Sequence, residues 1–326
     1  MRRLLMAAAV ATAAVLTLTA CGTTEPAADD KGKKSAERIT LTDASGAKVT
    51  LDGPAKKVVG TEWNAVESLI SLGVDPIGVA DVKGYTMWDT AVPLRNDPKD
   101  IGTRGEPSMD TIASLSPDLV VATTDLPPAA VKQLRRVAPV LEVRAADASD
   151  PIGQMTDNLD LIARATGTTQ RAGTLKKQFE TKAAQGKKAL AAAGLDGEKL
   201  AFADGYITSN QVSIRPYTKG SLIGAVNEKL GLKDAWTVKG DKDYGLATTD
   251  VEGLTRLGDV RFAYIGSDGD ANSTPFNGAL AKDSVWKSLP FVKKGEVHRL
   301  PDGIWMFGGP QSMGAYIDAI VKALTK

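Results

Sequence analysis

The pattern of apolar and polar positions alternates between short apolar runs and amphipathic segments, and residues 100–125 show it most clearly. Pro107 suits a first helical turn, and an apolar stripe from Met109 to Leu115 predicts a short helix after it. Pro117 predicts the end of that helix, because a residue before proline avoids the helical region. The continuous apolar run Leu119–Ala122 then predicts a parallel strand covered on both faces.

The same pattern predicts elements along the rest of the chain. Helices are expected at Trp63–Leu72, Pro127–Val137, Ser221–Leu230, Asp250–Leu257 and Gln311–Leu324, and strands at Lys56–Gly60, Ile77–Ala80, Val140–Val143, Leu200–Ala203 and Val260–Ile265. Hairpins are expected within Ile39–Leu51 and around Gly295, and residues 81–99 read as a long loop. Alternating strands and helices predict an α/β fold with parallel sheets.

Two lobes follow from the arrangement of these elements. Residues 250–268 repeat the helix, break and strand of the first stretch, which favours two Rossmann-like lobes with a ligand cleft between them. Residues 151–193 keep helical spacing without a strand signal, so we expect a long, rigid interlobe helix there. The N-terminal lobe is then 38–150 and the C-terminal lobe 194–326, with little hinge motion between them.

The N-terminus reads as a bacterial lipoprotein signal. Arg2 and Arg3 precede the apolar run Leu4–Leu18, which is short for a membrane span, and Leu18-Thr19-Ala20-Cys21 matches a lipobox. We expect a signal peptide at 1–20, lipidation of Cys21, and a flexible polar tether through residue 37. The protein would then be anchored to the extracytoplasmic face of the cell membrane.

Composition narrows the chemistry. The 326 residues carry 40 Lys and Arg against 39 Asp and Glu, a balance that argues against nucleic-acid binding. The sequence has one Cys and one His, His298, so it cannot build the usual cluster of His and Cys ligands around a metal. His298 lies in a strand-like run and is expected to be structural. No metal is expected to be held directly by the polypeptide.

Catalytic motifs are missing from the sequence. It contains neither a G-x-S-x-G elbow nor H-E-x-x-H, and its glycine-rich spots lack the Lys of a phosphate loop. A binding protein without a cofactor is therefore expected. A carboxylate-dependent hydrolase remains an alternative, because carboxylates occur throughout the chain.

Aromatic and Arg side chains in predicted loops are the best candidates for binding a ligand. Arg104 and Arg215 each lie beside Gly or Pro, where a planar fork of donors can bond paired anionic oxygens. The aromatic candidates are Trp63, Tyr85, Trp88, Tyr217, Tyr244, Trp286, Trp305 and Phe307. Any of these is also compatible with a place in the core.

Taken together, the sequence resembles the iron-siderophore substrate-binding proteins of ABC importers, over nearly the whole chain after the signal. The matching segments are Gly73-Val74 with Ile77-Gly78-Val79, Asp100-Ile101-Gly102 with Pro107-Ser108-Met109-Asp110, Ser116 to Val120, Gly220-Ser221, Gly231-Leu232 and Trp305 to Ser312. The resemblance implies two α/β lobes joined by one long helix. It also implies a protein, expected to be a monomer, that captures a ferric siderophore and delivers it to a membrane permease.

Roles for single residues follow from the same resemblance. Arg104 falls where ferric-hydroxamate binders of this family place an Arg that bonds hydroxamate oxygens, so a hydroxamate siderophore is expected. Arg215 with Tyr217 falls where the second lobe commonly contacts the ligand, and Trp305 falls in the last loop facing the cleft.

Permease docking in this family uses one acidic residue on each lobe. Here Asp110 stands where Glu is usual, and on the second lobe Glu252 is favoured over Asp250. Alternatives within the same fold are haem, which needs Tyr or His298 as its axial ligand, and cobalamin. A scaffolding lipoprotein is a further alternative.

Overall fold

The computed structural model describes residues 38–326, so the predicted signal peptide, Cys21 and the tether lie outside the described residues. The first elements are β1 (Ile39–Thr42) and β2 (Lys48–Leu51), which pair antiparallel and confirm the predicted hairpin. By their contacts the described residues belong to one unit. Within residues 38–326, no helix is long and apolar enough to cross a membrane.

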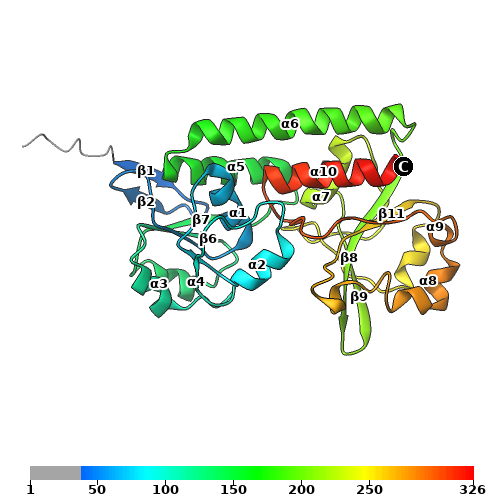
Figure 1. Cartoon of the computed structure of the whole chain (residues 1–326), viewed down its shortest axis with the longest axis horizontal. Helices are drawn as coiled ribbons and strands as arrows, with labels where there is room; N and C mark the ends of the chain where they lie inside the picture. The colour runs from blue at the N-terminus through cyan, green and yellow to red at the C-terminus, as the bar shows by residue number, and fades with distance from the viewer. Residues whose placement is uncertain (1–37) are drawn as a thin grey trace, which may run out of the picture. The chain divides into compact units, whose positions relative to one another are not determined.

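The first sheet is parallel throughout, in the order β5-β4-β3-β6-β7. Its strands are β3 (Val58–Gly60), β4 (Gly78–Val79), β5 (Lys99–Asp100), β6 (Leu119–Thr123) and β7 (Val140–Val143). The helices between them are α1 (Trp63–Leu72), α2 (Val82–Trp88), α3 (Met109–Leu115) and α4 (Pro128–Leu134). Every residue of β6 is buried, as its continuous apolar run predicts. Helices and strands alternate through this half (Figure 1).

The second sheet is mixed. Strands β8 (Lys199–Thr208), β10 (Lys233–Asp234), β11 (Arg261–Tyr264) and β12 (Val297–Arg299) are parallel in the order β10-β8-β11-β12. Strand β9 (Gln211–Pro216) folds back antiparallel on β8. The helical elements are α7 (Leu222–Lys229), η1 (Gly253–Arg256), η2 (Ala271–Ser273), η3 (Leu280–Lys282), α8 (Ser284–Ser288) and α9 (Pro290–Lys293).

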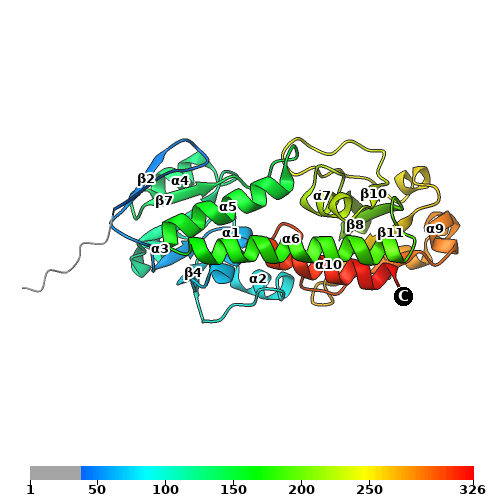
Figure 2. The same ribbon diagram turned by 90° about the horizontal axis from the view of Figure 1, so that it is seen from above.

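The segment predicted as one interlobe helix is two helices. They are α5 (Pro151–Thr166) and α6 (Thr169–Ala192), and the break is Gly167, whose φ of 72° ends α5 in the left-handed conformation. α5 packs on α1, β1 and β7 and also contacts α7, while α6 contacts α1, α5, α7 and α10 (Pro310–Leu324). Both helices therefore contact helices of the two halves, and α6 runs beside α10 (Figure 2).

One apolar core links the two sheets. It contains Trp63 of α1 and Phe179 of α6 together with Phe202, Tyr217 and Tyr316 of the second half. Phe202 packs edge-on against both Tyr217 and Tyr316, with ring centroids 5.2 and 5.4 Å apart. A core shared in this way fixes the position of residues that rise from either sheet.

Three local expectations were wrong, and one strand was missed. Residues 81–99 are not all loop, because α2 occupies Val82–Trp88 behind the N-cap Asp81. The turn at Gly295 does not form a hairpin but leads from α9 into β12, which pairs parallel with β11. The predicted helix at 250–257 is only the short 3-10 helix η1. Strand β9 was missed, although Val212 and Ile214 alternate with polar residues as in a half-buried strand.

Candidate functional site

A cavity of about 270 Å³ lies between residues of the two halves. Its lining residues are Glu62, Asn64, Arg104, Tyr206, Arg215, Tyr244, Leu246, Trp305 and Phe307. The first three come from the start of α1 and the loop after β5, at the carboxyl ends of parallel strands. The others come from β8, β9 and two loops of the second half. Such an edge of an open α/β sheet is where ligands commonly bind.

Arg104 is held on an aromatic platform. Its guanidinium carbon lies 4.0 Å from the centre of the Trp63 ring, and its Nη1 donates to Glu62 Oε1 at 2.9 Å. Trp63 is buried, and its Nε1 donates to the carbonyl of Ala80 at 3.0 Å, so the platform itself is fixed. Glu62 also accepts from the backbone N–H of Trp63. The Arg104 side chain is 37% exposed and keeps further N–H donors for a ligand.

Arg215 is held by a buried carboxylate. It lies on β9 directly opposite Asp204 of β8, and its Nε donates to Asp204 Oδ1 at 2.9 Å while its Nη2 bonds Oδ2. The hydroxyl of Tyr217 donates to the same carboxylate at 3.1 Å. Burial raises the pKa of Asp204, and the charge of Arg215 opposes that rise. The bidentate pair fixes the guanidinium plane, so Arg215 can present its remaining donors to the cavity.

Aromatic rings continue from Arg104 to the far wall. The ring centroids of Trp63 and Trp305 are 4.8 Å apart, those of Trp305 and Phe307 are 5.1 Å apart, and those of Phe307 and Tyr244 are 5.7 Å apart. Phe307 also lies 5.6 Å from the guanidinium carbon of Arg215. The two arginines are thus joined by a row of aromatic side chains, which gives the cavity an apolar surface with cationic groups at both ends.

Tyr244 bridges the two halves. Its hydroxyl hydrogen-bonds a carboxylate oxygen of Asp125, which follows β6 of the first sheet. Burial raises the pKa of Tyr244, and the bond to Asp125 raises it further, so the phenol stays protonated and donates. Asp241 positions the Tyr244 loop, because its carboxylate accepts from the N–H groups of Asp243, Tyr244 and Leu246.

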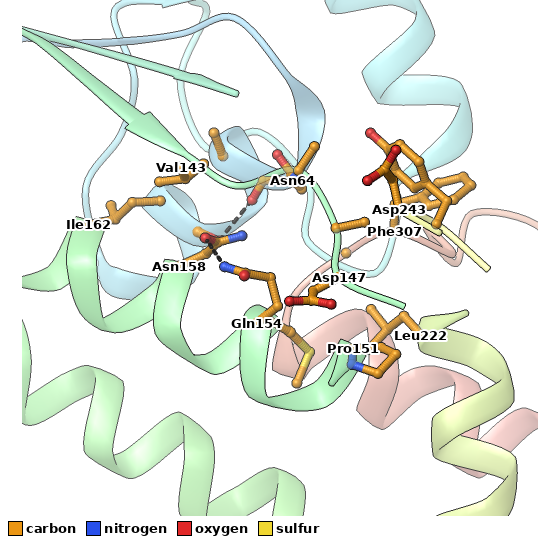
Figure 3. Close-up of a pocket in the computed structure, with 18 of the residues that line it drawn as sticks. Asn64, Val143, Asp147, Pro151, Gln154, Asn158, Ile162, Leu222, Asp243 and Phe307 are labelled. Atoms are coloured by element: carbon orange, nitrogen blue, oxygen red, sulfur yellow. Dashed lines mark hydrogen bonds between the residues drawn. The ribbon is translucent and has the colours of Figure 1, made fainter. Parts of the chain in front are cut away.

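A smaller pocket of about 40 Å³ adjoins the cavity and shares Asn64, Tyr244 and Phe307 with it. Figure 3 shows its polar floor, where Gln154 Nε2 donates to Asn158 Oδ1 at 2.9 Å. The volume suits an ordered water or a small group rather than a whole ligand. This pocket is therefore a polar extension of the main cavity.

The structure brings together most, but not all, of the predicted ligand residues. Arg104, Arg215, Tyr244, Trp305 and Phe307 line the cavity. Trp63 and Tyr217 are buried and support the two arginines from below.

Three predicted aromatics lie elsewhere, and their assignment as ligand contacts is corrected. Tyr85 is fully buried and donates its hydroxyl proton to the carbonyl of Val92 at 2.6 Å. Trp88 packs against the shared core at the end of α2. Trp286 lies in the separate core around Phe262.

Sequence reasoning missed four lining residues. Glu62 and Asn64 follow β3 and flank Trp63, so the carboxyl end of a predicted strand was an available signal for them. Tyr206 and Leu246 gave no such signal. Tyr206 lies on the part of β8 beyond the predicted strand, and Leu246 lies in an irregular loop.

The acidic residues expected to contact a permease are all exposed. Asp110 lies in the first turn of α3, which Ser108 caps. Asp250 already has a structural role, since its carboxylate accepts from the N–H of Gly253 at 2.9 Å. Among residues 38–326 the side chain of Glu252 has no hydrogen bond or ion pair.

The groups considered for direct metal binding do not gather. His298 lies on β12, where its Nε2 is 3.2 Å from Glu296 Oε2, and it does not line the cavity. In the part of the chain that the structure describes, no three His, Cys, Asp or Glu side chains are grouped so as to hold a metal ion.

Comparison with known proteins places the chain in a family. A family model described as periplasmic binding protein matches residues 58–303. The chain is 25% identical over 269 residues to the iron(3+)-hydroxamate-binding protein of Escherichia coli, covering 82% of this chain and 86% of that protein. It is 27% identical over 297 residues to the Fe(3+)-citrate-binding protein of Bacillus subtilis, covering 90% and 87%.

The fold is also shared with solved structures. The siderophore-binding protein of Vibrio cholerae with Fe3+-Desferal bound superposes with a TM-score of 0.73 at 24% identity, covering 83% of this chain and 98% of that one. The family match spans well over half of the sequence and includes both sheets. The chain belongs to the periplasmic binding protein family.

Proposed function

We propose that this protein binds a ferric siderophore outside the cytoplasm and delivers it to the permease of an ABC importer. Relatives that match over most of their length are named for binding ferric hydroxamate and ferric citrate. The resemblance seen in the sequence motifs points the same way. The family is one of binding proteins, and no step of covalent chemistry is proposed for this chain.

The observation that carries the proposal is the placement of two guanidinium groups in one aromatic cavity. Arg104 and Arg215 come from different halves of the fold and both line it, with Trp305 and Phe307 between them. An Fe3+ chelate presents anionic oxygens around the metal and an apolar outer rim. Guanidinium N–H groups suit the oxygens, and the aromatic rings suit the rim.

Charge balance favours a hydroxamate chelate over other ferric chelates. The cavity arginines are matched by nearby carboxylates, because Arg104 pairs with Glu62 and Arg215 pairs with Asp204. Three singly charged hydroxamates cancel the charge of Fe3+, whereas three doubly charged catecholates leave the complex strongly anionic. A nearly neutral cavity binds a neutral complex without leaving an unpaired charge in a dry site.

Anchoring and docking complete the proposal. Lipidated Cys21 would hold the folded part near the membrane through the tether, and Asp110 and Glu252 would meet basic groups of the permease. Both carboxylates are exposed, and Glu252 is unengaged among the described residues. These features allow docking without disturbing the cavity, since neither residue lines it.

Titration against a panel of ligands tests the ligand class. The panel contains a ferric trishydroxamate, a ferric triscatecholate, ferric citrate, haem and cobalamin, and the signal is quenching of tryptophan fluorescence, because Trp63 and Trp305 contact the site. We expect saturable quenching by the ferric trishydroxamate at the lowest concentrations. A Soret shift with haem, or tighter binding of the catecholate, would contradict the proposal.

The residues that line the cavity support haem as the ligand less well than a ferric chelate. The phenols that line it are already engaged, Tyr206 with Asp204 and Arg215, and Tyr244 with Asp125. An axial role would require one of these hydroxyls to leave its partners.

A further inference from the structure

Two acidic side chains lie buried directly behind the cavity. Glu67 of α1 and Asp89, the residue that ends α2, are both inaccessible to solvent. The two groups are neighbours, because Ser312 donates its N–H to Glu67 at 3.2 Å and its hydroxyl to Asp89 at 3.4 Å. No Lys or Arg forms an ion pair with either of them among residues 38–326. A buried pair of like charges without a cation is costly, so the pair requires a proton.

Unpaired oxygen atoms locate that proton. Glu67 Oε2 and Asp89 Oδ2 are both buried, and neither has a hydrogen-bond partner among the described residues. The other oxygen of each group is engaged. Glu67 Oε1 accepts from the N–H of Ser312 at 3.2 Å, and Asp89 Oδ1 accepts from the N–H of Val92 at 3.2 Å. One proton between the two free oxygens satisfies both of them.

The surroundings decide which acid carries the proton. Burial raises the pKa of Glu67 too, but Glu67 lies at the N-terminus of α10, where the backbone N–H groups of Ser312 and Gly309 oppose that rise and favour its negative charge. Asp89 has a single backbone donor, Val92, and the Ser312 hydroxyl at 3.4 Å. Among the described residues, Tyr85 of the same helix also acts on Asp89, and burial raises the pKa of Tyr85 so that it stays neutral.

We propose that Asp89 carries a buried proton that it donates to Glu67, and that this proton bridge positions the aromatic floor of the cavity. The floor residues Trp305 and Phe307 come just before Gly308 and Gly309, which pass close over the Glu67 carboxylate. A Cβ at Gly308 would lie 2.0 Å from Glu67 Oε2, so the backbone rests against that atom. Glu67 thereby ties the loop of the second half to α1, which also carries Trp63 below Arg104. Asp89 and Glu67 are positioning residues in this account.

The bridge gives the protein a defined response to pH. Burial, with the charge of Glu67 adding to it, raises the pKa of Asp89 from 3.8 to about 9. The native state therefore holds a proton that the unfolded state releases near pH 4. The contribution of Asp89 to the free energy of unfolding is fully present below that pH. As pH rises, the folding equilibrium constant falls by about tenfold per unit, until Asp89 ionises in the native state near pH 9. Above that pH the repulsion of two carboxylates is expected to loosen the loop of Trp305 and Phe307.

The test compares the full chain with its Asp89→Asn variant in urea unfolding from pH 5 to pH 10. Asn keeps the shape, accepts from Val92 and donates to Glu67 without needing a proton. We expect near parity at pH 5 and a folding equilibrium at pH 8 that favours the variant by on the order of a thousandfold. Asp97→Asn, which changes an exposed carboxylate, is the matched control and should follow wild type at every pH.

Carbon-13 NMR of the Asp89 carboxyl group in the wild-type protein shows directly whether Asp89 carries the proton, even if the variant does not fold. A titration centred near pH 9 supports the proposal. A titration near pH 4, or an Asp89→Asn variant less stable than wild type at pH 8, overturns it.

A third measurement rests on the proposed function. Above pH 9 the affinity for a ferric trishydroxamate should fall by about tenfold per unit in wild type and stay constant in Asp89→Asn. If wild type and Asp89→Asn lose affinity in parallel above pH 9, the proposed link between the Asp89 proton and the residues of the cavity floor is overturned. If no chelate binds at any pH, the proposed function fails while the unfolding and NMR results still judge the proton bridge.

Discussion

The guanidinium carbon of Arg104 lies 4.0 Å from the centre of the Trp63 ring while its Nη1 bonds Glu62 at 2.9 Å. The ring fixes the plane of the guanidinium, and Glu62 takes only one of its donors. Both supporting residues come from the N-terminal turn of α1 and the residue before it. The cation is thus oriented before any ligand arrives, which lowers the ordering cost of binding.

Removal of this cation should weaken ligand binding without unfolding the protein. Arg104→Ala is expected to lower the affinity for a ferric trishydroxamate by about 2 kcal/mol, the range of hydrogen bonds to a charged group. Arg104→Lys should restore only part of it, because a point charge cannot reproduce the planar fork. Fluorescence titration measures the affinity, and thermal unfolding is the control. Unchanged affinity in Arg104→Ala would remove Arg104 from the site.

The Arg215 and Asp204 pair should serve both stability and binding, and the two roles can be separated. Arg215→Ala leaves the buried carboxylate of Asp204 without its cation and is expected to cost about 3 kcal/mol in the free energy of unfolding. The double variant Arg215→Met with Asp204→Leu should recover most of that stability, since an apolar pair fills the space without a buried charge. It should not recover ligand affinity. Recovery of binding in the double variant would show that Arg215 only supports the fold.

Permease docking should depend on charge at two exposed positions. Asp110→Arg and Glu252→Arg are each expected to abolish ferric-siderophore uptake in cells while leaving ligand affinity unchanged, because neither side chain lines the cavity. Asp318→Arg on α10 is the matched control, because it also reverses the charge of an exposed side chain. It should leave uptake intact. Uptake assays with radioactive iron and titrations of the purified variants make the comparison. Intact uptake in both variants would contradict the docking roles.

Membrane attachment should depend on Cys21, which lies outside the described residues. Replacing it by Ala is expected to remove incorporation of radioactive palmitate and to release the protein from the membrane fraction, because two or more acyl chains on Cys21 are the stable anchor in this account. Equal labelling of Cys21→Ala and wild type would show that the anchor lies elsewhere or is absent.

Much of the fold was predictable because its strands are short apolar runs with clear ends. Leu119–Ala122 between Pro117 and Thr123 is such a run, and it forms β6. Helix α1 was predicted at its observed bounds, since Gly73 ends it in the left-handed conformation. β9 was missed because its alternation covers only six residues, and its antiparallel partner β8 was predicted to end at Ala203. Gly167 marks the break between α5 and α6 in the sequence. The sequence does not show, however, that the helix after it packs against different elements.

Site residues were predictable where the residue type itself implied ligand chemistry. They were not predictable where packing alone determines whether a side chain reaches the cavity. Arg104 and Arg215 stood out as long cations beside turn residues, and both line the cavity. Tyr85 had the same loop context as Tyr244, yet α2 turns it into the core while Tyr244 reaches Asp125. Glu67 gave no signal at all, because its role depends on α10, which lies more than two hundred residues further along the chain.

The central claim is tested most directly by a crystal structure of the complex with a ferric trishydroxamate, with an anomalous difference map that locates the iron. The account predicts one iron peak in the cavity between Arg104 and Arg215, coordinated only by chelate oxygens, with guanidinium N–H groups bonded to those oxygens. An iron ion ligated by protein side chains, or a chelate bound away from both arginines, would contradict it.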